Sequence, residues 1–210
     1  LLSKDVKSAN YERKKLKRAV KSLSGFSLLL GLNNSKGEKV ELSHHNIYFP
    51  KNYDEEFNEI FTKKIPVNDP TIYICAPNDS AMVSDGNKEA WFVLVNAPRH
   101  EPGIGWDWSQ QSESYAQKIL NKLDSLGLNV SSRLEFFKFR TPADLESYAL
   151  APGGSIYGTS SNSVRSAFLR ARNRSKTHGL FCVGGSSHPG GGLPLVGISA
   201  QIVANSIGKA

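Results

Sequence analysis

VGGSSHPGGGLPLV, residues 183–196, is the stretch that decides how the C-terminal part of the chain folds. It lies between an apolar, β-like run at residues 180–183 and an apolar run that predicts a final helix from about residue 194 to residue 207. Pro194 suits the first helical position, because its missing N–H costs nothing there. A strand, a glycine-rich turn and a helix bring backbone N–H groups and the positive end of a helix dipole against an anion.

Two interpretations of this stretch stay open. Gly190, Gly191 and Gly192 carry no side chains, so a ligand can lie directly on the main chain. The final helix is apolar on nearly all sides, so we expect it to be buried with its N-terminus aimed at this glycine platform. The alternative is a Gly/Pro loop that only turns a corner, and the residues favour neither.

Other site chemistries fit the sequence less well. His188 stands where a nucleophile elbow needs its last glycine, and no P-loop motif is present. His44 and His45 are adjacent and are expected to diverge on a strand or a helix, so no metal site is predicted. No pair of acids indicates general acid/base chemistry, and the catalytic residues stay unknown.

Composition indicates a globular protein, with 210 residues, 39% of them hydrophobic and 10% aromatic. No apolar run approaches the roughly 20 residues that a membrane-spanning helix needs. Cys75 and Cys182 each lie in a β-like run, which predicts buried free thiols and a cytoplasmic protein. The chain does not begin with Met and opens within a charged segment, so we expect a piece of a longer protein.

Residues 4–21 carry most of the net charge of +7. Apolar residues recur there at helical spacing, namely Val6, Ala9, Leu16, Ala19 and Val20. This pattern is typical of a solvated helix face or of a helix on an anionic membrane surface. Nucleic acid is not an expected partner, because no aromatic residues alternate with the charges to stack bases.

The rest of the chain predicts an α/β fold in which a mixed or antiparallel sheet carries helices on one face. The expected strands are residues 25–32, 46–49, 71–76, 91–97 and 133–139, the second following the first across a hairpin-sized gap. The expected helices are residues 53–61 and 109–126, with a further helix start at Thr141-Pro-Ala-Asp144. From Ala151 the sequence becomes rich in Gly, Ser and Asn.

The stretch GLFCVGGSSHPGGGLPLVGISAQIVANSI, residues 179–207, resembles the C-terminal flavin-binding signature of the bacterial phytoene desaturase family. This family includes diapophytoene desaturases and diaponeurosporene oxidases. Further stretches resemble it in the same order, and the resemblance covers about residue 23 to the end of the chain. They are SGFSLLLGLN from Ser24, LSHHNIYFPKNYDEEFNEIF from Leu42, DPTIYICAPN from Asp69, APGGSIYG from Ala151 and RARNRSKTHGLFCVGG from Arg170.

The resemblance implies part of a fold like that of the flavin amine oxidases. Residues 25–150 would form a mixed-sheet substrate-binding domain, and residues 151–210 the C-terminal segment of a Rossmann-like FAD/NAD(P)-binding domain. Residues 1–24 would be the tail of a helical cap. The Gly-x-Gly-x-x-Gly motif that opens such an FAD domain is absent from these residues, so the N-terminal FAD-binding half would be a missing partner.

The resemblance also implies FAD as the cofactor, bound by two groups of residues. The group near the pyrophosphate and ribityl chain is Gly184, Gly185 and Ser186. The group that presents the final helix to the pyrimidine edge of the flavin is Gly191, Gly192, Leu193 and Pro194. The helix dipole would stabilise the negative charge of the reduced ring. His188 would either line this site or bond within its own loop.

The implied function is oxidation of long polyene hydrocarbons in carotenoid synthesis by an FAD-dependent oxidoreductase at the surface of the cytoplasmic membrane. Residues 26–32 and 91–95 would floor an apolar tunnel for the polyene or pack as an ordinary core. This piece alone is expected to be inactive. Desaturase and terminal oxidase are not separated by these motifs, nor are C30 and C40 substrates. The alternative is a non-catalytic piece that binds lipid or a partner and lacks the FAD-binding half.

Overall fold

The computed structural model describes residues 6–77, 79, 81–83, 85–101, 103, 106–160 and 170–208. The chain divides into two compact units. Unit 1 consists of Leu1–Ser22 and Ser155–Ala210, and unit 2 is Leu23–Gly154. None of the helices in the described ranges combines the length and the apolar character needed to span a membrane.

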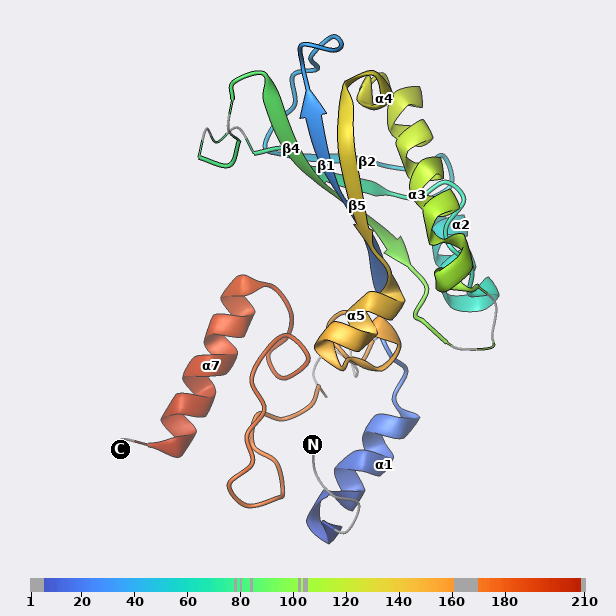
Figure 1. Ribbon diagram of the computed structural model, residues 1–210. Helices are drawn as coiled ribbons and strands as arrows, with labels where there is room; N and C mark the ends of the chain where they lie inside the picture. Colours follow the sequence, from blue (N-terminus) through green and yellow to red (C-terminus); the bar gives the residue numbers. More distant parts are fainter. Residues whose placement is uncertain are drawn as a thin grey trace. The chain divides into compact units, whose positions relative to one another are not determined.

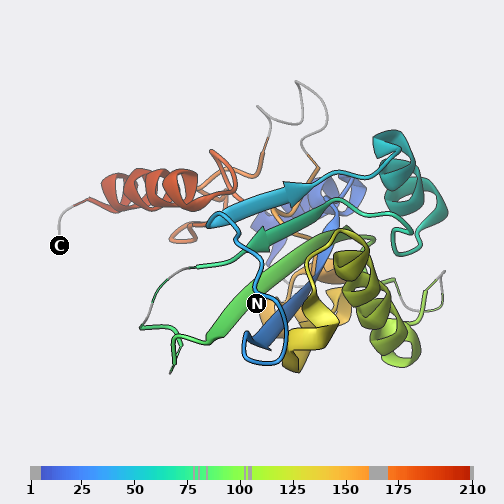
Figure 2. The same cartoon turned by 90° about the horizontal axis from the view of Figure 1, so that it is seen from above.

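Unit 2 is built on one five-stranded sheet in the order β2-β3-β4-β1-β5, which can be followed in Figure 2. The strands are β1 (Ser24–Asn33), β2 (His45–Tyr48), β3 (Ile72–Cys75), β4 (Lys88–Ala97) and β5 (Leu134–Arg140). All of these pairs are antiparallel, so the sheet is not mixed. All five predicted strands are confirmed.

The expected pairing of the second strand with the first across a hairpin is wrong. β2 does not follow β1 as a hairpin but pairs with β3, with Tyr48 opposite Ile72. Both of these side chains contribute to the core, Tyr48 at its margin. Sequence proximity favoured the hairpin, whereas burial of apolar side chains on one face of the sheet decides the pairing.

Helix α3 (Trp108–Ser125) runs along one face of the sheet, as Figure 1 shows. Its predicted apolar face is confirmed, since Tyr115, Ile119 and Leu123 are buried in the core. The predicted helix at residues 53–61 forms as α2 (Tyr53–Phe57) followed by the π-helix η2 (Asn58–Lys63). The short helices α4 (Val130–Arg133), α5 (Pro142–Ala149) and η3 (Pro152–Gly154) complete the unit.

The start of α5 follows from its sequence. The Thr141 hydroxyl accepts a hydrogen bond from the Asp144 N–H at 3.1 Å, and the Asp144 carboxylate accepts from the Thr141 N–H at 2.8 Å. Pro142 occupies the first turn, where no N–H is needed. The predicted capping arrangement is therefore confirmed.

The sheet residues expected to form either a tunnel floor or a core form the core. Alternate side chains of β1 and β4 are buried with those of α3, namely Phe26, Leu28, Leu30, Leu32, Trp91, Val93 and Val95. A small cavity of about 30 Å³ beside Ile60 and Phe61 has room for about one water molecule. A long polyene does not fit there.

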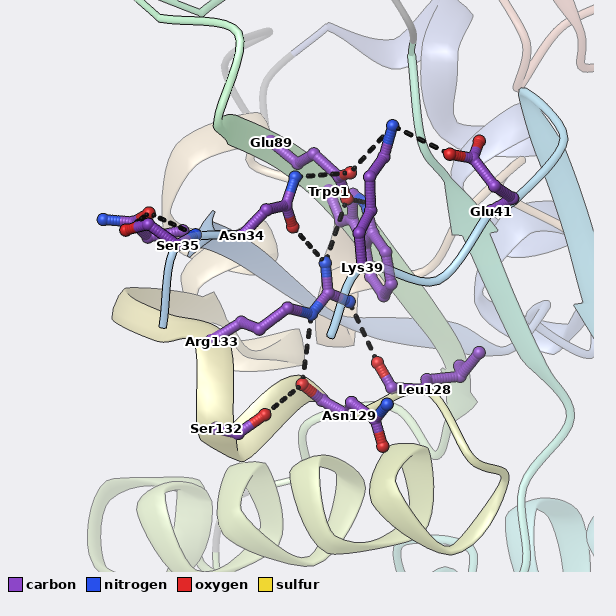
Figure 3. A network of polar contacts seen from close by, with 11 residues as sticks. Asn34, Ser35, Lys39, Glu41, Glu89, Trp91, Leu128, Asn129, Ser132 and Arg133 are labelled. Carbon is purple, nitrogen blue, oxygen red and sulfur yellow. Dashed lines mark hydrogen bonds and ion pairs between the residues drawn. The ribbon is translucent and has the colours of Figure 1, made fainter. Parts of the chain in front are cut away.

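A buried arginine at the end of α4 joins this helix to the residue after β1 and to the beginning of β4. Arg133 is fully buried, and one terminal nitrogen donates to Asn34 Oδ1 at 2.7 Å and to Glu89 Oε2 at 3.3 Å. Its other terminal nitrogen donates to the Leu128 carbonyl at 2.9 Å, and its guanidinium lies 5.1 Å from the ring centre of Trp91. Figure 3 shows Arg133 at the centre of this network. The partners satisfy a charge that would otherwise be costly to bury.

The described residues of unit 1 include the 3-10 helix η1 (Lys7–Ala9), the helix α1 (Asn10–Arg18) that follows it, and the helix α7 (Leu193–Ile207). α1 has no buried residues and carries several Lys and Arg side chains. Leu16 on the helix is 49% exposed, and Val20, just beyond its end, is 73% exposed. The Glu12 carboxylate accepts from the Ser175 hydroxyl at 2.7 Å and the Lys176 N–H at 3.0 Å, which fixes α1 to that turn.

Two predictions for unit 1 are wrong. Residues 180–183 do not form a strand, because the described part of unit 1 gives them only an isolated bridge between Arg174 and Phe181 and no neighbouring strand to complete a ladder. Helix α7 forms at the predicted place but is not buried. Only Ser199 and Val203 are buried on it, and its nonpolar side chains point largely to solvent in the described chain.

The cysteines and two histidines also differ from expectation. Both cysteines are free as predicted, but Cys75 is only half-buried and Cys182 is exposed. The rings of His44 and His45 do not diverge, since their centroids lie 4.4 Å apart. His44 precedes β2, so the alternation of side chains along a strand does not apply to this pair.

Candidate functional site

The glycine loop, residues 183–192, takes backbone conformations that most side chains disfavour. Gly184, Gly190 and Gly192 have φ angles of +118°, +148° and +96°. The loop closes on itself through a hydrogen bond from the Ser187 N–H to the Gly184 carbonyl at 3.0 Å. Glycine is required at these positions because a Cβ would be strained there.

Two other glycines permit close packing. A Cβ on Gly191 would overlap the ring of Tyr157, and a Cβ on Gly185 would lie 3.3 Å from the Gly191 Cα. The main chain at Gly191 is therefore covered by an aromatic ring, not bare as expected. Tyr157 is 52% exposed, so the other side of its ring is partly open to solvent. This part of the glycine platform acts in internal packing.

A buried arginine, Arg170, joins the glycine loop to Tyr157 by hydrogen bonds to backbone carbonyls. Arg170 is 8% exposed, and a terminal nitrogen donates to the Tyr157 carbonyl at 2.6 Å and the Gly185 carbonyl at 2.7 Å. Its Nε is buried without a hydrogen-bond partner among the described residues. Its described partners are carbonyl oxygens and not carboxylates, so none of them neutralises its positive charge.

Polar side chains hold the loop against α7. The Asn173 amide nitrogen lies 2.8 Å from Ser199 Oγ and 2.8 Å from the His188 carbonyl oxygen. Ser199 Oγ in turn accepts from the Gly184 N–H at 3.2 Å. Asn173 and Ser199 are both buried. This short network fixes the start of the glycine loop against the middle of α7.

The N-terminus of α7 fits an anion or an electron-rich ring. Gly192 precedes the helix, Pro194 lies in its first turn, and no side chain caps it. The N–H groups of Leu193 and Leu195 therefore have no intrahelical acceptor. Leu193 is 89% exposed, and the first turn carries no acidic residue that would repel an anion.

The structure places the two predicted groups of site residues on one loop. Gly184 and Gly185 are half-buried, and the exposed Ser186 packs on Gly158, where a Cβ would lie 3.0 Å from the Ser186 Cβ. Gly192, Leu193 and Pro194 are exposed, and Gly191 is half-buried. His188 is exposed, and its backbone N–H donates to the Ala171 carbonyl at 2.8 Å.

The sequence reasoning missed the residues that support the loop. They are Tyr157, Arg170, Asn173 and Ser199. Two of the matching stretches, those from Ala151 and from Arg170, contain the first three of them. A buried arginine and a buried asparagine in a polar, loop-like sequence have no periodicity that would mark them as internal.

Unit 2 offers a second candidate surface, which we call the outer sheet face. It lies opposite α3, and cross-strand pairs place Ile47, Tyr73 and Leu94 in one row. The next row contains Cys75, Phe92 and Leu29. Leu29 and Ile47 are 50% and 56% exposed, although both are strongly apolar. Exposed apolar patches of this kind are typical of binding surfaces.

Comparison with known proteins finds relatives of this chain among carotenoid desaturases. No model of a protein family matches it. The chain is 38% identical over 170 residues to the 1-hydroxycarotenoid 3,4-desaturase of Flavobacterium sp. (strain P99-3), covering 80% of this chain and 34% of that protein. It is 32% identical over 183 residues to the hydroxyneurosporene desaturase of Rubrivivax gelatinosus, covering 86% and 34%.

A third relative is an oxygenase. The chain is 30% identical over 213 residues to the 4,4'-diapolycopene oxygenase of Methylomonas sp, covering 98% of this chain and 41% of that protein. The chain thus spans between about a third and two fifths of the length of these relatives. Over most of its own length, the chain is a homologue of the carotenoid desaturases and oxygenases.

Proposed function

We propose that this chain is the C-terminal part of an FAD-dependent carotenoid desaturase or oxygenase. In this proposal residues 25–150 bind the polyene, residues 151–210 return into the FAD domain and residues 1–24 end a helical cap. The observation that carries the proposal is the sequence match over 80% to 98% of the chain with relatives named for these activities. The N-terminal half of the FAD site would come from residues outside this sequence.

The glycine loop is the proposed contact to FAD. Its pyrophosphate and ribityl chain would lie by Gly184, Gly185 and Ser186, and its pyrimidine edge by the segment from Gly191 to Pro194. The loop fits an anionic group because the buried Nε of Arg170 lacks a partner among the described residues and the N-terminus of α7 is uncapped. FAD, when bound, supplies the two-electron oxidation.

The residues of the chain would bind and orient. The N–H groups at the start of α7 would stabilise negative charge at the pyrimidine edge, since they lie at the positive end of the helix dipole. Arg170 donates to the Gly185 carbonyl at 2.7 Å, and this hydrogen bond would keep the carbonyl oxygen turned away from the anion. The exposed ring of Tyr157 would shield that side of the loop from water.

The outer sheet face and α1 are the proposed contacts to substrate and membrane. A polyene hydrocarbon would lie against exposed apolar side chains such as Leu29 and Ile47. Because such a substrate dissolves in the bilayer, the exposed basic helix α1 would hold the protein peripherally on the cytoplasmic membrane. Its exposed Leu16 and Val20 would enter the headgroup region.

Pigment analysis tests the proposal directly. The whole protein would be produced in bacteria that accumulate diapophytoene, and the extracted pigments compared with those of cells producing the protein without residues 183–208. Desaturation would lengthen the chromophore, and oxygenation would add a carbonyl group. If the protein accumulates but neither diapophytoene nor an already desaturated polyene is changed, the non-catalytic alternative replaces this proposal.

A further inference from the structure

One cluster of ligating side chains lies outside the glycine loop, at the edge of the sheet in unit 2. One ring nitrogen from each of His44 and His45 and the sulfur of Cys75 lie within 4.8 Å of one another. The cluster follows from strand pairing, because His45 on β2 stands directly opposite Cys75 on β3. The Ala76 N–H donates to the His44 carbonyl at 2.9 Å, which keeps His44 beside the same end of β3.

We propose that His44, His45 and Cys75 bind one borderline-soft divalent metal ion of the Zn²⁺ class. Imidazole nitrogen and thiolate sulfur are the ligands such ions prefer, whereas Mg²⁺ and Ca²⁺ require oxygen. In a tetrahedral zinc site with bonds of about 2.0–2.3 Å, neighbouring ligand atoms lie about 3.3–3.8 Å apart. The cluster is therefore within about 1–1.5 Å of a binding geometry.

Small side-chain rotations would close this difference. His44 and His45 are exposed and Cys75 is half-buried, so none of the three is locked by close packing on all sides. The backbone is already set by the β2–β3 pairing, which leaves only side-chain torsions to adjust. The exposed histidines also give the ion a route from solvent.

Tyr73 supports the site as an orienting neighbour. Its hydroxyl lies 2.8 Å from His45 Nδ1, and its ring stacks on that of His45 with 6.0 Å between the centroids. In the proposed site this contact would occupy Nδ1, and Nε2 of His45 would be the metal ligand. Metal-bound histidines commonly have such a partner on their second nitrogen, and it fixes the orientation of the ring.

The ion would act at one edge of the sheet. β2 is an edge strand of four residues and is paired only with β3 within the described sheet. Two ligands precede or begin β2 and the third ends β3, so a bound ion would join the two strands. With three protein ligands the fourth position would hold water or another ligand.

Metal titration of the 210-residue chain tests this inference. The chain would be stripped of metal, kept reduced with a phosphine and titrated with Zn²⁺ by calorimetry and with Co²⁺ by absorption. We expect one ion per chain, a thiolate-to-cobalt charge-transfer band and a higher melting temperature with Zn²⁺. Mg²⁺ should produce none of these effects.

Matched variants separate this site from adventitious binding. Cys75→Ser and His45→Asn should weaken Zn²⁺ binding at least about tenfold, and Tyr73→Phe should weaken it less while leaving the fold unchanged. Cys182→Ser and His178→Asn change exposed residues of unit 1 and should bind like the unaltered chain. Binding with a stoichiometry other than one, or equal binding by Cys75→Ser, would mean an adventitious ion only and would overturn the inference.

Discussion

The ring of Tyr157 occupies the space beside Gly191 that a Cβ at position 191 would need. Replacing Gly191 with Ala should therefore push the ring aside and lower the free energy of unfolding by about 1–3 kcal/mol. Chemical denaturation would measure the change. Gly197→Ala is the matched control, because a Cβ there meets open space and a helix interior prefers alanine.

A double variant identifies the cause. In a Tyr157→Ala background the steric overlap is gone, so Gly191→Ala should cost much less than in the unaltered chain. An equal cost in both backgrounds would show that the glycine is needed for backbone conformation and not for the ring.

FAD binding by the isolated chain should be weak or absent. The glycine loop supplies one helix N-terminus, that of α7, and the sequence contains no Gly-x-Gly-x-x-Gly for the pyrophosphate. Quenching of flavin fluorescence during titration would measure this, and micromolar affinity would contradict it. In the whole protein, Arg170→Gln should weaken FAD binding about tenfold or more, as expected for a hydrogen bond to a charged group. The exposed neighbour Arg172→Gln should leave it unchanged.

Arg133 should be among the most sensitive positions of unit 2. Arg133→Met leaves the Leu128 carbonyl and Asn34 Oδ1 without their donor and removes one charged partner of the half-buried Glu89, so it should lower the free energy of unfolding by about 1–3 kcal/mol. Lys138→Met, on the exposed side of β5, is the control and should change it by less than about 0.5 kcal/mol. Urea denaturation of both variants distinguishes a structural anchor from a surface charge.

Much of unit 2 could be predicted from local sequence. The face of α3 follows from helical periodicity, and the start of α5 follows from Thr141, Pro142 and Asp144. The pairing of β2 with β3 could not, because it joins segments separated by α2 and η2 and local patterns do not encode such distances. The burial of Arg133 likewise depends on partners about 44 and 99 residues away in sequence.

Unit 1 was less predictable for a related reason. Hydrophobic composition indicated a strand at residues 180–183 and a buried α7, but burial requires a second surface that the pattern itself does not supply. The glycines were recognised as special, yet their division between strained turns and close packing depends on Tyr157, which lies about 30 residues earlier.

Stability at acid pH should depend on Asp69. Its carboxylate lies 2.7 Å from Lys122 Nζ and accepts from the Lys51 N–H at 3.0 Å, and these contacts hold its pKa below the ordinary value. The folded state therefore binds this proton more weakly than the unfolded state. The resulting stabilisation is present above about pH 4 and is lost as the pH falls through the lower folded pKa.

Asp69→Asn isolates this contribution. At pH 7 the variant should be less stable than the unaltered chain by less than about 1 kcal/mol, because the carboxylate is partly exposed. At about pH 2 the two should be equally stable. Glu113→Gln, at an exposed position of α3, is the control, and a difference between Asp69→Asn and the unaltered chain that persists at low pH would exclude the ion pair as its cause.

Helix α1 should bind anionic membranes. Vesicles containing phosphatidylserine should bind the chain more strongly than neutral vesicles, with about 1 kcal/mol per basic residue near the surface. Lys14→Glu with Lys17→Glu should abolish the difference in a sedimentation assay. Lys138→Glu makes a charge change of the same kind in unit 2 and should retain binding. Equal binding by all three proteins would exclude α1 as the contact.

The exposed apolar side chains of α7 have a practical consequence for handling this chain. Leu193, Ile198 and Ile207 are 89%, 45% and 64% exposed, so α7 presents apolar side chains through which copies of the chain can associate. Self-association should grow with protein concentration and with sulfate, which strengthens the burial of apolar surface, and mild detergent should reverse it. Expression yield and colloidal behaviour would then be set by one helix and not by the stability of either unit.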